Sequence, residues 1–189
     1  MEKKSILQIR EAAFEANYFQ KKDAELVRRL KAVFNKAIDR ETIRATTGVT
    51  DEQVLDRLID LNLSGEMMAA FELLPIVEVA WADGGGDKKK CRAVLEAAEQ
   101  YGVVPGSKAY EMLERRLNEG PSQDSRKVWF MYAAELKKTL SPEQLAEFRK
   151  DLLDLCNRVA EASGGILGLV LKTSANEHRV IDAVEKALA

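Results

Sequence analysis

The stretch Val79-Ala80-Trp81-Ala82-Asp83-Gly84-Gly85 recurs 80 residues later as Val159-Ala160-Glu161-Ala162-Ser163-Gly164-Gly165, and this repeat indicates the fold class. In both copies an apolar helical pattern ends at two glycines, and a new helical pattern follows them. A helix, a glycine loop and a second helix therefore occur twice. The sequence predicts an all-α helical bundle with an internal pseudo-two-fold duplication.

Helical spacing of apolar residues extends outward from this repeat over almost the whole chain. Pro75 lies inside the most apolar of these segments, where it is expected to kink a central buried helix. The expected helices are residues 5–39 (two helices divided near 20–23, with Asp23 as a cap), 40–47, 51–61 opened by a capping box from Thr50, 65–81, 87–102, 107–118, 123–139, 142–162 and 174–189. We expect residues 1–64 to form an N-terminal helical extension with a small hairpin, and residues 65–189 to form the bundle.

Composition supports a helical, globular protein. The 189 residues are 46% apolar and 32% charged, with 4 Pro and 11 Gly, and the formal charge of −2 does not by itself indicate nucleic acid or an anionic membrane as a partner. No apolar stretch has the length of a signal-peptide core or a membrane span. Cys91 and Cys156 lie in helical patterns outside any CxxC motif, which favours buried reduced thiols. We therefore expect a cytoplasmic protein without direct membrane insertion.

The repeat also resembles the TerB-like family, bacterial helical proteins grouped with tellurite-resistance and stress-response systems. The resemblance rests on residues 79–84 followed by a helix start, and on Ala160, Gly164 and Gly165 before a second helix that carries Glu177. It covers about residues 66–189. It implies a helical bundle, no enzymatic activity, and an acidic residue in each Ala-Asp-Gly loop paired with a Glu a few residues later, an arrangement that implies divalent-cation binding.

This chain matches that acidic pattern only in part. Asp83 matches the first acidic position, but Lys90 stands where the family pattern usually has Glu; in the second copy Ser163 replaces the Asp and Glu177 is kept. Asp83, Asp87 and Glu177 are the candidate ligands of a calcium or magnesium ion, provided that the two loops meet in space. The alternative is structural: Asp87 as a helix N-cap and Glu177 as a member of a capping box.

Other motifs favour structural interpretations. His178 is the only histidine and begins a polar helix, so it is expected to be a solvated surface residue. The segment 84–90 lacks the order of a phosphate-binding loop, and its three lysines, 88–90, are expected to form a solvated turn. Trp81, Trp129, Phe130 and Tyr132 are expected to anchor the core.

Two function classes remain open. We expect a non-enzymatic interaction or scaffold protein that binds other proteins. The alternative is a small DNA-binding regulator that uses residues 40–61 as a helix-turn-helix. Asp51, Glu52, Asp56 and Asp60 oppose this alternative, because they would face the phosphate backbone.

Overall fold

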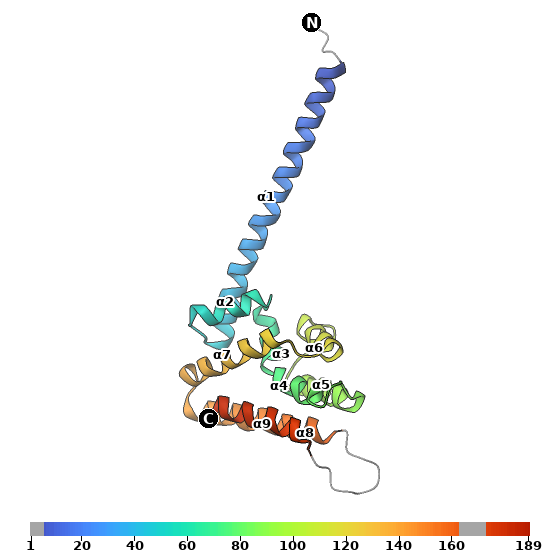
Figure 1. The fold of residues 1–189 in the computed structure, drawn as a ribbon. Helices are drawn as coiled ribbons and strands as arrows, with labels where there is room; N and C mark the ends of the chain where they lie inside the picture. Colours follow the sequence, from blue (N-terminus) through green and yellow to red (C-terminus); the bar gives the residue numbers. More distant parts are fainter. Residues whose placement is uncertain (1–5, 163–172) are drawn as a thin grey trace. The chain divides into compact units, whose positions relative to one another are not determined.

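The computed structural model describes the backbone of residues 6–162 and 173–189, and the side chains of residues 18, 20–162 and 173–189. Within these ranges the secondary structure is entirely helical, with nine α-helices and one short 3-10 helix (Figure 1). The expected all-α class is confirmed. The loop at Ser163-Gly164-Gly165 lies outside the described residues, and the internal duplication stays a prediction.

The chain divides into two compact units, residues 1–39 and residues 40–189. Helix α1 (Ile6–Thr47) contributes to both units. The expected break near residues 20–23 is wrong, because Gln, Lys and Lys favour helix and no Gly or Pro interrupts them. The expected separate helix at 40–47 is the last part of α1, which ends at Thr47 and is followed by Gly48 with a φ of 72°.

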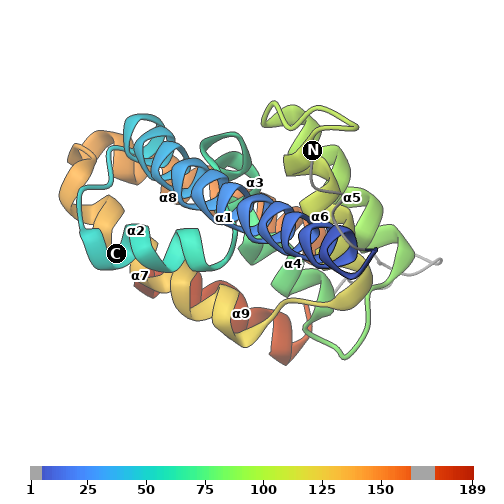
Figure 2. The same ribbon diagram turned by 90° about the horizontal axis from the view of Figure 1, so that it is seen from above.

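The second unit includes the residues expected to form a hairpin. Helix α2 (Glu52–Asp60) begins at Asp51, whose carboxylate accepts hydrogen bonds from the backbone N–H groups of Gln53 and Val54, so Asp51 rather than Thr50 is the N-cap. Val54, Leu55, Leu58 and Ile59 turn inward, and Figure 2 shows α2 alongside α7 (Gln123–Thr139). The division between units therefore falls after Asp39, not after residue 64.

The apolar segment after residue 64 is not one kinked helix. It comprises a 3-10 turn (Gly65–Met67), α3 (Met68–Glu72) and α4 (Leu74–Trp81). Pro75 stands in the first turn of α4, where its missing N–H costs no helical hydrogen bond, so it begins a helix instead of bending one. Seven of the eight residues of α4 are buried, and α4 contacts α5, α6, α8 and α9. The expected central buried helix is therefore confirmed for α4.

Four further helices enclose α4: α5 (Lys88–Gln100), α6 (Lys108–Glu119), α8 (Pro142–Glu161) and α9 (Ala175–Leu188). Side-chain N-caps begin α5 and α6, and full capping boxes begin α8 and α9. Trp129 and Tyr132 are buried core residues, whereas Trp81 is half-buried and donates from Nε1 to the Leu117 carbonyl at 3.1 Å. Among the described residues, none of the helices combines the length and apolar character that a bilayer crossing requires.

Candidate functional site

The segment that follows α4 and the starts of α5 and α9 meet at a buried ion pair that the sequence interpretation did not predict. Asp83 follows α4, Lys90 lies in the first turn of α5, and Glu177 lies in the first turn of α9. The Lys90 ammonium lies 2.6 Å from Glu177 Oε1 and 3.6 Å from Asp83 Oδ2. Lys90 and Glu177 are only 5% and 2% exposed. The structure thus brings two of the three predicted metal ligands around one ammonium group.

The capping box of α9 holds these carboxylates in place. The Ser174 backbone N–H donates to Glu177 Oε2 at 2.6 Å, and the Glu177 N–H donates to Ser174 Oγ at 3.1 Å. The Ser174 hydroxyl in turn donates to Asp83 Oδ1 at 2.7 Å. This hydrogen bond, together with the charge of Lys90, lowers the pKa of Asp83. The start of α9 is therefore linked directly to the loop that follows α4.

A divalent cation does not fit this arrangement. Calcium and magnesium need several oxygen ligands with an open position between them, and here the Lys90 ammonium already lies between the carboxylates of Asp83 and Glu177. The third predicted ligand, Asp87, is the N-cap of α5, and its Oδ1 accepts from the Lys89 and Lys90 N–H groups at 2.7 and 3.4 Å. In the described part of the chain, no group of three or more His, Cys, Asp or Glu side chains has the spacing of a metal site. The arrangement is an internal ion pair in which Lys90 lies beside the carboxylates of Asp83 and Glu177.

Lys90 is the residue that the sequence interpretation missed. The three lysines were expected to form a solvated turn; Lys88 and Lys89 are exposed, but Lys90 is buried. One signal in the sequence could have identified it: a positive lysine stands at position 90, where the family pattern usually has a negative Glu. Such a lysine can serve as the counter-charge of the retained Glu177. His178, beside Glu177, is exposed as expected.

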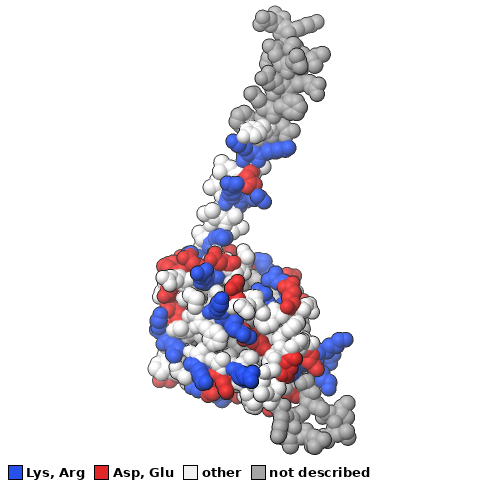
Figure 3. Space-filling view, in the orientation of Figure 1, with Lys and Arg blue, Asp and Glu red and all other residues white. Residues whose placement is uncertain are grey.

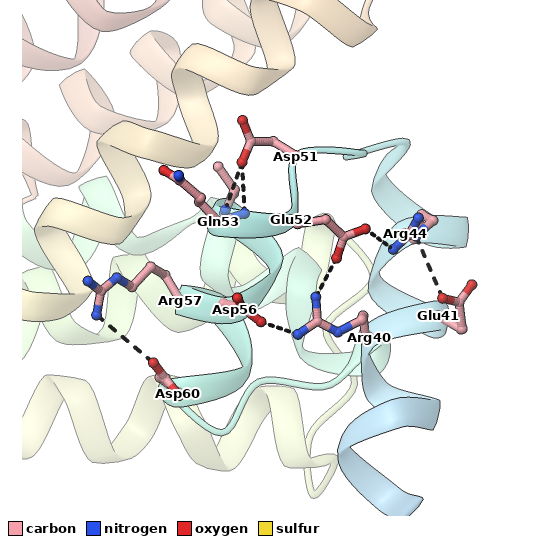
Figure 4. Close-up of polar contacts among 10 residues, drawn as sticks. Arg40, Glu41, Arg44, Asp51, Glu52, Gln53, Asp56, Arg57 and Asp60 are labelled. Carbon is pink, nitrogen blue, oxygen red and sulfur yellow. Dashed lines mark hydrogen bonds and ion pairs between the residues drawn. The ribbon is translucent and has the colours of Figure 1, made fainter. Parts of the chain in front are cut away.

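The hairpin of α1 and α2 carries a second polar cluster, in which acidic side chains of α2 bind arginines of α1 (Figure 4). Arg40 pairs with Asp56 and, at 2.6 Å, with Glu52, whose other oxygen lies 2.8 Å from Arg44. Arg40 and Arg44 are therefore engaged by carboxylates, whereas Arg57 of α2 is exposed and lies 4.0 Å from Asp60. Carboxylates beside each of these arginines disfavour the helix-turn-helix alternative.

A groove of about 320 Å³ in the second unit holds a third polar group. The Tyr132 hydroxyl donates to Glu72 Oε1 at 2.5 Å, and the groove walls include Leu136, Leu140 and Phe148. Burial raises the pKa of both Glu72 and Tyr132. Sequence inspection had no signal for this pair, since its members lie 60 residues apart. The hydrogen bond joins α3 to α7 and gives the buried carboxyl a partner.

Comparisons of the chain with protein-family models, with curated proteins and with solved structures find no match. The TerB-like resemblance therefore stays a prediction that rests on the residues quoted for it.

Proposed function

We propose that this chain is a non-enzymatic interaction protein that binds a partner through an apolar face of helix α1. In this proposal residues 65–189 form a TerB-like bundle with an internal duplication, which serves as a scaffold in a stress response. The observation that carries the proposal is the exposure of six large apolar side chains on one side of α1.

These six residues define the α1 arc: Leu26, Val27, Leu30, Val33, Phe34 and Ile38. Their exposed fractions run from 47% for Ile38 to 69% for Val33. At 3.6 residues per turn they share an arc of roughly 140°. Six basic residues of α1 lie outside this arc: Lys21, Lys22, Arg28, Arg29, Lys31 and Lys36. Figure 3 shows white side chains between blue ones along this part of α1.

An exposed apolar face of this kind is typical of an interface. Single exposed apolar residues are common on monomeric proteins, but a contiguous set on one helical face marks an interaction site. Burying such side chains stabilises a complex by about 25 cal/mol per Å² of apolar surface, before the entropic cost of association. The arc therefore presents the exposed apolar face that partner binding requires.

The polar clusters of the second unit support a structural and not a catalytic role for that unit. Lys90 is neutralised by Glu177, Arg40 is neutralised by Glu52 and Asp56, and Glu72 is hydrogen-bonded by Tyr132. Each of these contacts joins two different helices. Their common effect is to fix the packing of the bundle.

The proposal is tested by capture of partners from an extract of the cells that make the protein. Full-length protein carrying Leu30→Ser and Val33→Ser is compared with protein carrying Ala32→Ser and Asn35→Ser, which lie on the opposite side of the same helix. We expect proteins that bind the wild type to be lost from the arc variant and kept by the control. Equal capture by both variants would refute a role for the arc.

A further inference from the structure

Three residues of the α1 arc, Leu26, Leu30 and Val33, belong to a regular seam that continues along the helix beyond the arc. From Ile9 to Ala37, spacings of three and four residues alternate without exception, and eight of the nine positions are apolar. The seam positions are Ile9, Ala12, Ala16, Phe19, Asp23, Leu26, Leu30, Val33 and Ala37. Four successive heptads in which all core positions but Asp23 are apolar are typical of helices that pair with other helices along their length.

The seam stops where the second compact unit begins. The next two positions in the series are Arg40 and Arg44, and both are held by acidic residues of α2: Arg40 by Glu52 and Asp56, and Arg44 by Glu52. At these positions the helix is covered by its own chain. Before them, Leu26, Leu30 and Val33 are 56%, 60% and 69% exposed.

The residues that flank the seam favour a second copy of the chain as the partner. On one side lie Val27 and Phe34, and on the other lie Lys22, Arg29 and Lys36. When two copies run parallel, each flanking residue of the basic side faces the residue five positions later on the other copy. Lys22 then faces Val27 and Arg29 faces Phe34, so that the long aliphatic stems cover apolar side chains while their charges reach solvent.

The same residues disfavour an antiparallel pair. In that orientation the basic side of one helix lies along the basic side of the other, and Lys22, Arg29 and Lys36 repel their counterparts. Asp23 is the single charged residue in the seam. In a parallel pair it meets its own copy, which costs stability and fixes the register, as polar residues at core positions do in coiled coils.

We infer that helix α1 pairs in parallel and in register with α1 of a second copy of this chain, and that the compact units 40–189 are thereby joined as a dimer. This inference rests on the proposed function, since it names the partner of the α1 arc.

The test is sedimentation equilibrium of the full chain over a wide range of concentration. A chain of 21.1 kDa is expected to reach 2 × 21.1 = 42.2 kDa. Leu30→Glu with Val33→Glu should reduce the mass to that of a monomer. The matched control, Ala32→Glu with Asn35→Glu, adds the same charge on the opposite side and should remain dimeric. Both variants should retain the melting transition of the compact unit, because all four positions are exposed.

Two further variants test the orientation. Asp23→Leu should tighten the dimer, because it removes the charged pair from the seam. Leu30→Cys, made in a Cys91→Ser background, should oxidise to a disulfide-linked dimer, because in-register parallel helices place the two residue-30 side chains together. A dimer that resists both arc glutamates, or that forms no residue-30 disulfide, would overturn the inference.

The effect of salt on association distinguishes a second copy of the chain from an acidic partner. Association of two basic helices should be unchanged or stronger at high salt, because screening reduces their repulsion. Co-sedimentation of a monomeric protein with vesicles of phosphatidylserine and phosphatidylcholine, lost at high salt, would instead identify an anionic surface and overturn the inference. A monomer whose arc variants still lose a captured protein would refute the dimer and leave the proposed function standing.

Discussion

Replacing Lys90 by methionine should destabilise the protein much more than the same change one residue earlier. Methionine keeps an unbranched apolar stem but lacks the terminal ammonium group, which lies 2.6 Å from Glu177 Oε1. Glu177, only 2% exposed, then carries an uncompensated charge in the core. Removing one partner of a buried ion pair costs about 3–5 kcal/mol.

The geometry places the expected loss near the lower end of that range. Glu177 keeps the 2.6 Å hydrogen bond from the Ser174 N–H, so that its charge is not left without a donor. We therefore expect a loss of about 3 kcal/mol in the free energy of unfolding. For a unit of this size, the melting temperature should fall by roughly 6–12 °C.

Urea denaturation followed by circular dichroism measures this loss. Lys89→Met is the matched control, because Lys89 is exposed on the same turn of α5. The double variant Lys90→Met with Glu177→Gln should recover most of the lost stability, since it leaves no unpaired charge. If Lys90→Met were no less stable than Lys89→Met, the ion pair would not be a structural element, and the reasoning would be wrong.

Three other outcomes follow from the same structure. The melting temperature of the wild type should be the same in calcium, magnesium or EDTA, because Lys90 fills the space between Asp83 and Glu177; a rise with calcium that Asp83→Asn abolishes would contradict this. Burial raises the pKa of Glu72, so the protonated carboxyl group favours the folded state. This contribution to stability is complete below the unfolded-state pKa of about 4.3, and it is lost as the pH rises through the folded-state pKa. Glu72→Gln should therefore gain stability relative to the wild type between about pH 4 and pH 8 in denaturation experiments, and a constant difference would refute the assignment. Gly120→Ala should cost about 1–3 kcal/mol, because residue 120 has a φ of 86° and its added Cβ would lie 3.3 Å from the Trp81 ring, whereas Gly85→Ala, with open space around it, serves as the control in the same melts.

Local signals in the sequence were sufficient for most helix boundaries. Asp87 is an N-cap as predicted, and the helices expected from residues 142 and 174 begin at Pro142 and Ala175, because a cap needs only residues within one turn of itself. The continuous helix α1 was missed because a polar segment at residues 20–23 was taken as a break, although nothing in it opposes a helix. Pro75 was placed inside a helix rather than at a helix start, since the periodicity of the surrounding apolar residues hid the boundary at Leu73.

The candidate site was predicted only in part. The sequence named Asp83 and Glu177 as members of one site only on the condition that the two loops meet in space, and the structure brings these two side chains to the same ammonium group. The burial of Lys90 depends on the packing of α5 against α4, and the Glu72–Tyr132 hydrogen bond depends on the packing of α3 near α7. Neither arrangement has a local sequence pattern. The exposure of the α1 arc was also hidden, since an apolar face has the same pattern whether it is covered or not.

Site-specific photo-crosslinking tests the central claim, that the α1 arc is an interface, most directly. A benzophenone amino acid replaces Phe34 in the arc in one protein and Asn35, on the opposite side of the same helix, in another. Both proteins are irradiated in the cells that make them, and the adducts are separated by mass. We predict covalent adducts from position 34, at the mass of two chains when the partner is a second copy, and none from position 35. The absence of adducts at position 34, or equal adducts at both positions, would contradict the account.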